Sequence, residues 1–184
     1  MLEIIDYYNY NKSSVYVLML DASKAFDRVN YCKLFGELLK RDISPLILRL
    51  LLHMYTNQTL RVKWGHTVSD MFNVMNGVKQ GGVLSPILFA IYTDGLLRRL
   101  QETGVGCHMG HRYSGALAYA DDITLLSPSK SGLTILVDEC ERYAAEYDIL
   151  FNGNKSKLLY IRDRYCKPAK IGIDVHHFLS GCSY

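Results

Sequence analysis

The feature that most restricts the fold is a short, continuous apolar run that ends at a charged residue. Residues 15–20 read Val-Tyr-Val-Leu-Met-Leu, and Asp21 follows directly. A run this short and this rich in β-forming residues predicts a strand, and the lack of polar alternation predicts that both faces of the strand are buried. A carboxylate at the end of such a strand is costly unless it is solvated, paired or bound to a cation.

Helical segments follow this strand. Apolar residues at helical spacing predict a helix over Tyr31 to Leu39. Two further helices are expected to begin at Ser44-Pro45 and Ser85-Pro86, where serine can cap the helix and proline suits its first turn. The first should run to about Tyr55 and the second to about Arg99. The expected apolar face of the second helix is made of Leu84, Ile87, Leu88, Ile91 and Tyr92.

Short apolar runs elsewhere predict further strands, and one more helix is expected. Residues 9–14 indicate a turn before the first strand. Leu60 to Trp64 and Met71 to Met75 predict a hairpin across Gly65-His66. The other expected elements are strands at Ala116–Tyr119, Ile123–Leu126 and Lys157–Ile161, and a helix at about Gly132–Tyr147 that buries Leu133, Leu136, Val137, Cys140, Ala144 and Tyr147. Strands and helices are mixed without regular alternation, which favours an α+β fold.

Three aspartates lie at the ends of expected apolar strands. Asp121 and Asp122 sit between two of them, and Asp21 can join them only if its own strand lies beside that hairpin. Adjacent residues on a strand point to opposite faces, so one of the pair should be the main ligand unless the backbone kinks. Converging carboxylates without His or Cys suit Mg²⁺, and two such ions ~4 Å apart can clamp a phosphoryl transfer. The alternative is that these residues only cap solvated turns.

Four segments resemble the polymerase motifs of reverse transcriptases from non-LTR, LINE-like retrotransposons. Residues 20–27, Leu-Asp-Ala-Ser-Lys-Ala-Phe-Asp, resemble motif A, and residues 77–89, Gly-Val-Lys-Gln-Gly-Gly-Val-Leu-Ser-Pro-Ile-Leu-Phe, resemble motif B. Tyr-Ala-Asp-Asp at 119–122 is typical of motif C, and Phe-Asn-Gly-Asn-Lys-Ser at 151–156 resembles motif D. The motifs occur in the family's order within about residues 15–160. The resemblance implies a right-hand polymerase palm, an antiparallel sheet with packed helices, plus part of the fingers.

The resemblance also implies a metal site. Asp21 and Asp121 match the family's main metal ligands, and Asp122 matches the adjacent carboxylate with a less direct role. The carbonyl of Ala22 would lie near a metal ion. The implied cofactor is a pair of Mg²⁺ ions, with Mn²⁺ as a substitute.

Substrate-binding residues are implied in the same way. Phe26 matches the bulky gate that rejects the 2′-OH of an incoming nucleotide, while Gln80, Gly81 and Gly82 match the loop that contacts that nucleotide and the template. Lys155 matches the motif D lysine, which can steady or protonate the leaving pyrophosphate. The implied reaction joins a dNTP to the 3′-OH of a DNA primer on an RNA template. Taken singly, these residues also suit a core ring, a turn and a solvated lysine.

Two departures from the family pattern bear on activity. Gly82 stands where many LINE-like enzymes have cysteine and is closer to intron-encoded relatives. Only about twenty residues precede Asp21, so the 184 residues are expected to be a partial reverse transcriptase domain that lacks the upstream fingers and the downstream thumb. The chain is therefore expected to be a polymerase segment or, alternatively, a truncated, catalytically inactive fragment that acts as an interaction module.

Composition adds general limits. Five cysteines at irregular spacings, without a C-x-x-C pair, favour reduced thiols in an intracellular protein of nucleus or cytoplasm. The net charge of +3 permits nucleic-acid binding without arguing for it, and no run reaches the ~18 apolar residues that a membrane span needs. Cys107, His108 and His111 admit a zinc alternative, though a polar hairpin is favoured there, and His176-His177 with Cys182 is a weaker candidate.

Overall fold

The computed structural model describes residues 1–162 of the 184. The weaker metal candidate, His176-His177 with Cys182, lies outside the described residues. The described residues divide into two compact units: one contains residues 1–23 and 93–162, and the other contains Lys24–Tyr92. No helix within residues 1–162 is long and apolar enough to cross a membrane.

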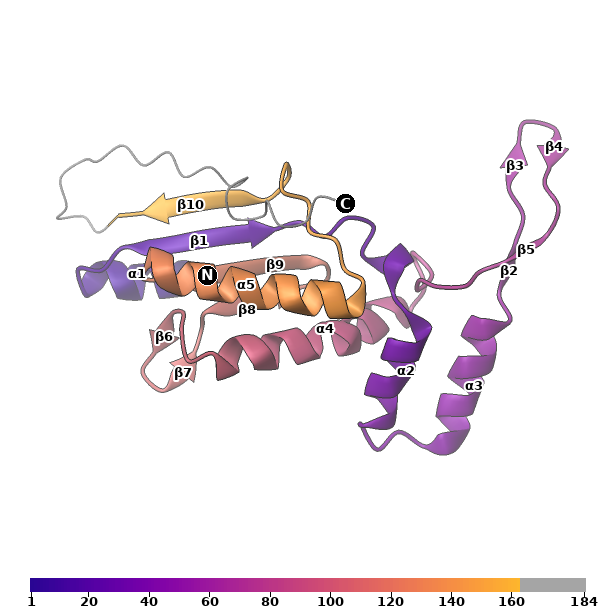
Figure 1. Ribbon diagram of the computed structural model, residues 1–184, viewed down its shortest axis with the longest axis horizontal. Helices are drawn as coiled ribbons and strands as arrows, with labels where there is room; N and C mark the ends of the chain where they lie inside the picture. Colours follow the sequence, from indigo (N-terminus) through magenta and orange to yellow (C-terminus); the bar gives the residue numbers. More distant parts are fainter. Residues whose placement is uncertain (163–184) are drawn as a thin grey trace. The chain divides into compact units, whose positions relative to one another are not determined.

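The first unit is built on a four-stranded antiparallel sheet in the order β10-β1-β9-β8 (Figure 1). The strands are β1 (Val15–Leu20), β8 (Ala116–Tyr119), β9 (Asp122–Ser127) and β10 (Lys157–Ile161). All four predicted strands are confirmed, and so is the burial of β1 on both faces. The strand with the longest apolar run lies inside the sheet, where two neighbours satisfy its backbone groups.

One face of the sheet packs against α5 (Lys130–Tyr147). Leu18 of β1 pairs with Leu125 of β9, so these two side chains share a face, and both are buried. Helix α5 contacts both strands and buries every residue that its apolar spacing predicted. Its N-cap is Ser129, whose side chain accepts a hydrogen bond from the Gly132 amide at 3.1 Å.

The opposite face is covered toward the start of β1 by α1 (Leu2–Tyr10). Ile4 and Ile5 of this helix form a buried cluster with Val15, Val17, Leu126 and Cys107. Sequence reasoning placed only a turn before the first strand and missed this helix. Two buried residues in a nine-residue helix give too weak a period to stand out from the surrounding tyrosines.

Cys107 directly precedes the hairpin formed by β6 (His108–Met109) and β7 (Arg112–Tyr113). Because its thiol is buried, the free energy of unfolding is expected to vary with pH in the alkaline range. Burial raises the pKa of the Cys107 thiol from 9.0 to about 11. The thiol stays protonated in the folded chain and ionises near pH 9 in the unfolded chain. The contribution to stability is therefore complete below pH 9 and is lost as the pH rises toward 11.

Between pH 9 and pH 11, ionisation of Cys107 should lower the free energy of unfolding by up to about 1.4 kcal/mol per pH unit. We expect Cys107→Ala to abolish this contribution. Urea unfolding at pH 8 and pH 10.5 measures the effect. The slope that remains should come largely from other buried groups such as Cys140, whose pKa is also raised by burial. An unchanged slope in the variant would show that Cys107 ionises equally readily in both states.

The second unit contains two antiparallel helices, α2 (Tyr31–Leu39) and α3 (Pro45–Thr56), which pack against each other. Both were predicted. Asn30 caps α2 by accepting a hydrogen bond from the Lys33 amide at 3.2 Å. The cap expected from Ser44 is absent, because its side chain makes no capping bond and α3 begins on Pro45 alone.

A β-ribbon follows α3, and we use this name for residues 57–76. Its outer part pairs β3 (Lys63–Trp64) with β4 (Thr67–Val68), and its inner part pairs β2 (Thr59–Leu60) with β5 (Phe72–Asn73). The turn lies at Gly65-His66, as predicted. Between the two parts, residues 61–62 face residues 69–71, so the ribbon contains a bulge of one extra residue. Figure 1 shows the ribbon leading away from the end of α3.

Helix α4 (Ser85–Glu102) belongs to both units. Leu88 and Tyr92 are buried as predicted, but Leu84 and Ile87 are exposed, so that part of the expected face was wrong. The buried face continues through Leu96, Leu100 and Phe89 instead. Spacing of three and four residues fits both sets, and tertiary packing decides between them.

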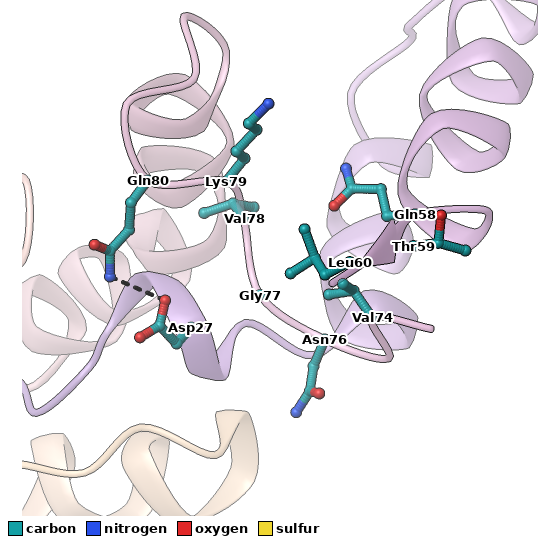
Figure 2. Close-up of a pocket in the computed structure, with 10 residues that line it drawn as sticks. All are labelled: Asp27, Gln58, Thr59, Leu60, Val74, Asn76, Gly77, Val78, Lys79 and Gln80. Atoms are coloured by element: carbon teal, nitrogen blue, oxygen red, sulfur yellow. Dashed lines mark hydrogen bonds between the residues drawn. The ribbon is translucent and has the colours of Figure 1, made fainter. Parts of the chain in front are cut away.

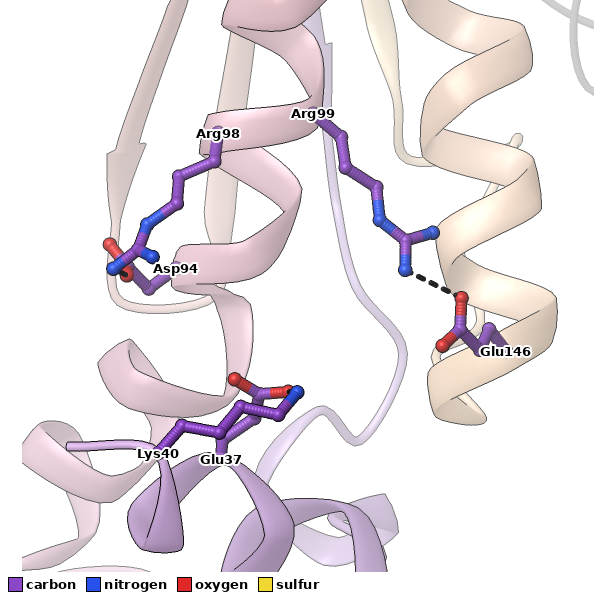
Figure 3. Close-up of polar contacts among 6 residues, drawn as sticks. All are labelled: Glu37, Lys40, Asp94, Arg98, Arg99 and Glu146. Carbon is purple, nitrogen blue, oxygen red and sulfur yellow. Dashed lines mark hydrogen bonds and ion pairs between the residues drawn. The ribbon is translucent and has the colours of Figure 1, made fainter.

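In the first unit, Arg99 connects α4 to α5. Its guanidinium donates a hydrogen bond to Glu146 at 2.7 Å (Figure 3). The guanidinium also lies 3.9 Å from a Glu139 oxygen and 5.0 Å from the centre of the Tyr143 ring. The bond to Glu146 raises the pKa of Arg99. The other two pairs in Figure 3, Arg98–Asp94 and Lys40–Glu37, lie within single helices and contribute little.

Candidate active site

The strand register brings Asp21 and Asp122 to the same end of the sheet. Leu20 of β1 and Ile123 of β9 form the last pair of this register; Asp21 directly follows Leu20, and Asp122 directly precedes Ile123. Paired residues of antiparallel strands have Cα atoms about 4.5–5.5 Å apart, so the two aspartates flank a close pair. Asp21 could join Asp121 and Asp122 only if its strand lay beside their hairpin. The pairing of β1 with β9 meets this condition.

Asp121 is positioned by the turn rather than by a strand. Tyr119 pairs with Asp122, which leaves Ala120 and Asp121 as a two-residue hairpin turn. Ala120 has a φ of 53°, in the left-handed region that primed hairpin turns require. This kink removes the expected conflict between two neighbouring aspartates on one extended strand. Asp121 is half-buried and Asp122 is exposed.

Asp21 and Asp122 border an exposed part of the sheet, which we call the open stretch. Its side chains share the face of Asp21 and Asp122, because they lie an even number of residues away on the same or paired strands. The open stretch consists of Met19, Leu117, Tyr119, Thr124, Lys157 and Leu159. Helix α1 covers the far part of this face, whereas Tyr119 is 85% exposed and Leu117 and Leu159 are also exposed.

The segment that follows α5 fixes the backbone of Asp21. The Asn152 amide donates to the Asp21 carbonyl at 2.8 Å, and the Asp21 amide donates to Ser156 Oγ at 3.3 Å. The buried Ser156 hydroxyl in turn donates to the Asn152 carbonyl at 2.8 Å. Ala22 forms a β-bridge with Phe151. Sequence reasoning gave Ser156 no role, since no local pattern shows that its hydroxyl meets a backbone amide 135 positions away.

Lys155 lies near Asp21. Its Nζ is 3.8 Å from Asp21 Oδ2. The Asn152 side chain shapes the turn that presents Lys155, because its Oδ1 accepts from the amides of Asn154 at 3.1 Å and Lys155 at 3.3 Å. The lysine side chain is largely exposed, so the ion pair adds little stability. Its consequence is to keep a positive charge beside the carboxylate.

The donor set of this region suits a hard cation. Asp21, Asp121 and Asp122 supply carboxylate oxygens, which are the ligands that Mg²⁺ prefers. As the side chains stand, no three Asp, Glu, His or Cys residues within 1–162 surround a single point. Three like charges repel unless a cation lies between them, and Asp21 is directed toward Lys155 instead. The residues fit a metal by chemistry and register, and gathering them around an ion requires side-chain rotation.

Cys107 and His108, two residues of the zinc alternative, are engaged in other contacts. Cys107 is buried in the cluster beneath α1, and His108 Nδ1 lies 3.2 Å from the Gly106 carbonyl. The His108 ring packs edge-on against Tyr113 in the β6–β7 hairpin. No metal-binding group forms from Cys107, His108 and His111 in the described part of the chain. The polar hairpin that the sequence favoured at this place is confirmed.

A second group of predicted site residues lies in the other unit. Phe26, in the short 3₁₀ helix η1 (Phe26–Arg28), stacks on Phe89 with ring centres 4.8 Å apart. Its carbonyl accepts a hydrogen bond from the Val78 amide at 2.7 Å. Gln80 Nε2 donates to Asp27 Oδ1 at 2.9 Å (Figure 2). The motif A and motif B segments of this unit are thus joined directly.

Asp27 and Gly77 are functional candidates that sequence reasoning missed. Asp27 closes the motif A segment, and its carboxylate accepts the hydrogen bond from Gln80. Gly77 has a φ of 89°, and a Cβ there would lie 2.8 Å from the Asp27 carbonyl oxygen. A side chain at position 77 would therefore clash with the Asp27 backbone. The signal was the glycine that opens motif B.

Gly81 and Gly82 have different local reasons for being glycine. Gly81 has a φ of 77° with open space around it, whereas a Cβ on Gly82 would lie 2.8 Å from Ser85 Oγ. Ser85 is itself buried and donates to the Lys79 carbonyl at 2.6 Å. These contacts fold residues 79–85 into a compact turn at the start of α4.

A cavity of about 600 Å³ lies beside this junction. Figure 2 shows Asp27 and Gln80 on one side of it and the ribbon residues Thr59, Leu60 and Val74 on the other. Its further lining residues include Gln58, Asn76 and Lys79. The lining combines polar amides, one carboxylate and one lysine with apolar side chains, as in a ligand-binding pocket.

The structure thus groups the predicted residues in two sets. Asp21, Ala22, Asp121, Asp122 and Lys155 lie in the sheet unit, while Phe26, Gln80, Gly81 and Gly82 lie in the helix and ribbon unit. In the sequence, only Ser23, Lys24 and Ala25 separate Ala22 from Phe26.

Comparison with known proteins identifies the family. Residues 2–175 match the model of the family described as reverse transcriptase (RNA-dependent DNA polymerase). The chain is 32% identical over 162 residues to the retrovirus-related Pol polyprotein from the type-1 retrotransposable element R2 of Nasonia vitripennis, covering 88% of this chain and 16% of that protein. It is 26% identical over 151 residues to the RNA-directed DNA polymerase from the mobile element jockey of Drosophila melanogaster, covering 79% and 16%.

The fold has counterparts among solved structures. Apo telomerase from Candida tropicalis, truncated from its C-terminal domain, superposes with a TM-score of 0.66 at 18% identity, covering 86% of this chain and 33% of that one. This chain spans only about a sixth of the length of the Nasonia polyprotein, so it corresponds to a part of such proteins. The family match and the α+β architecture agree: this chain belongs to the reverse transcriptase (RNA-dependent DNA polymerase) family, in the group carried by non-LTR retrotransposons.

Proposed function

We propose that this chain is the palm segment of an RNA-directed DNA polymerase that joins a dNTP to the 3′-OH of a DNA primer on an RNA template. The observation that carries the proposal is the register of the sheet. In it, Asp21 and Asp122 flank the last pair between β1 and β9, and Asp121 lies in the adjoining turn. The proposed ligands thus border the exposed side chains of the open stretch, where an extended substrate has access.

Asp21 and Asp121 are the proposed metal ligands, helped by Asp122 and by the carbonyl of Ala22. Reverse transcriptases use divalent metal ions, and two Mg²⁺ ions held here would favour ionisation of the primer hydroxyl and neutralise charge on the phosphates. The protein's own part is to hold its ligands in place. The hydrogen bonds from Asn152 and to Ser156 keep the backbone of Asp21 fixed during the reaction.

Lys155 is proposed to serve the leaving group. As the bond from the primer O3′ to the α-phosphorus forms, the bond from that phosphorus to the pyrophosphate oxygen breaks. The leaving oxygen gains negative charge, which a nearby ammonium can stabilise or protonate. Lys155 Nζ already lies 3.8 Å from a carboxylate oxygen of Asp21, so the cation is held near the proposed reaction centre.

The substrate is proposed to be selected by the second group. Phe26 is backed by Phe89, so a sugar hydroxyl that meets the ring cannot easily displace it. Gln80 is oriented by Asp27 for contact with the nucleotide. Gly81 and Gly82 let the backbone of the same loop approach the nucleotide and the template. The alternative function, an inactive fragment that serves as an interaction module, provides no reason to retain this complete set.

The test is dNTP incorporation on a primed RNA template with Mg²⁺ or Mn²⁺, comparing the chain with Asp121→Ala. Asp138→Ala removes an exposed carboxylate of α5 and serves as the matched control. We expect incorporation by the chain and the control, but not by Asp121→Ala.

Thermal unfolding in the presence of Mn²⁺ provides a second readout that does not require turnover. Binding to the folded state alone raises the Tm as the metal concentration rises. We expect this rise for the chain and for Asp138→Ala and its loss for Asp121→Ala. An equal rise in all three proteins, without incorporation, would favour the inactive-fragment alternative.

A further inference from the structure

We propose that the ribbon, residues 57–76, is a binding site for single-stranded nucleic acid, in which a base stacks on Trp64 while Arg61 and Lys63 bind phosphates. The inference rests on the proposed function for the class of partner, because a template-directed polymerase works on nucleic acid. It concerns residues that none of the proposed catalytic roles uses.

The ribbon is exposed along almost its whole length. Trp64 is 86% exposed, and every residue from Thr59 to Met71 is exposed. The other exposed large apolar residues of the ribbon are Leu60, Val62, Val68, Met71, Phe72 and Met75. A monomeric soluble protein rarely leaves so many apolar side chains uncovered together, and such patches mark interaction sites.

The outer strand pair presents an aromatic ring and a cation on opposite sides. Side chains alternate along a strand, so Trp64 and Lys63 of β3 project to opposite sides of the ribbon. Single-stranded nucleic acid offers the matching pair of surfaces, flat bases and charged phosphates. Proteins bind it by combining aromatic stacking with cationic contacts to the backbone.

The charge distribution selects a polyanion as the partner. Between Asp42 and Asp94 the sequence contains a single carboxylate, Asp70, against the cations Arg49, Arg61, Lys63 and Lys79. Within residues 1–162, neither Arg61 nor Lys63 makes an ion pair or a side-chain hydrogen bond. Their charges therefore remain available to phosphates, whereas an apolar protein segment would leave them unmatched.

The bulge prepares the ribbon for binding. Ser69 Oγ accepts from the Val62 amide at 2.9 Å and donates to the Asp70 carbonyl at 2.9 Å, while the Ser69 amide donates to the Val62 carbonyl at 2.9 Å. These bonds fix the path of the chain between the inner and outer strand pairs. Side chains on a fixed backbone lose less entropy when they bind. A single strand is preferred over a duplex because stacking requires an unpaired base.

Trp64 is the only tryptophan of the chain, so its fluorescence reports directly on the proposed site. We expect saturable quenching when the chain is titrated with a 20-nucleotide oligo(U) or oligo(dT), and much weaker quenching with a duplex of the same length. Affinity should fall with salt, and Arg61→Gln and Lys63→Gln should each reduce the log–log slope by about 0.7.

Variants test the two kinds of contact separately by anisotropy of a labelled oligo(U). Trp64→Leu keeps an apolar side chain without a stacking ring and should weaken binding about 10-fold, whereas Trp64→Phe should retain most of the affinity. Arg112→Gln removes an exposed cation from the β6–β7 hairpin and is the matched control, with unchanged affinity.

Two results would overturn the proposal. One is wild-type affinity in Trp64→Leu. The other is a blue shift of Trp64 emission that grows with protein concentration and is unaffected by the oligonucleotides, which would assign the ribbon to a second copy of the chain. Repeating the titration with Asp121→Ala separates the two proposals: intact quenching without incorporation leaves this site standing while the catalytic proposal fails.

Discussion

Asp21→Asn is expected to lower dNTP incorporation by about 10³-fold, because it removes the charge of a main ligand from the proposed metal site. Asp122→Asn is expected to have a smaller effect. Both residues border the open stretch, but the backbone of Asp21 is held by Asn152 and Ser156, and its carboxylate lies beside Lys155. Single-turnover incorporation with saturating Mn²⁺ measures both variants on the same primed template.

Stability distinguishes a chemical effect from a structural one. The asparagine side chain has the same size, and the hydrogen bonds that hold residue 21 come from its backbone. Removing one of several neighbouring negative charges relieves repulsion, so the Tm without metal should stay equal or rise. A larger loss of activity in Asp122→Asn than in Asp21→Asn would reverse the assigned order of the ligands.

Phe26→Ala is expected to reduce discrimination between a dNTP and the matching rNTP by about 10²-fold, a difference of about 2.7 kcal/mol in transition-state binding. The phenyl ring is proposed to fill the space that a 2′-OH would occupy. Its position is fixed by stacking on Phe89 and by the bond from the Val78 amide to its carbonyl. The ratio of kcat/KM values for dTTP and UTP measures the effect.

Phe26→Tyr is the conservative control, since it keeps a ring of similar width and should keep the discrimination. The dTTP value in Phe26→Ala should change much less than the UTP value, because the ring excludes one sugar more than it binds the other. If both nucleotides lost kcat/KM equally, Phe26 would act in packing alone, and the gate would have to be sought elsewhere in the chain.

Much of the secondary structure could be predicted because its causes are local. The apolar run before Asp21 and the periodic face of α5 each reflect burial in a single element, and both are confirmed. Helix α1 was missed because its short apolar segment acquires meaning only against Val15 and Val17 of the sheet. Exposure of Ile87 was missed for a related reason, since helical spacing alone admits more than one buried face of α4.

The candidate site shows the same contrast between local patterns and contacts of distant segments. The three aspartates could be selected from motif order, but their proximity depends on the pairing of β1 with β9, which no local pattern specifies. The bond from Gln80 to Asp27 and the place of Ser156 beneath Asp21 are contacts between distant segments. Sequence reasoning therefore proposed residues for the chemistry and missed the contacts that position them.

Because β1 lies between β9 and β10, it cannot pair fully during translation until both of these later strands have been made. Its partners β9 and β10 lie more than a hundred residues downstream, so the apolar strand must wait roughly 5–20 s for β9 to be translated. Residues 24–92 form a continuous unit, so the contacts inside it need no residue that is translated later. Asp21 acquires its full set of neighbours only once residue 156 has been made. The position on which the proposed chemistry depends is thus among the last to form, and a nascent chain that stops early lacks the proposed site and exposes an unpaired strand prone to aggregation.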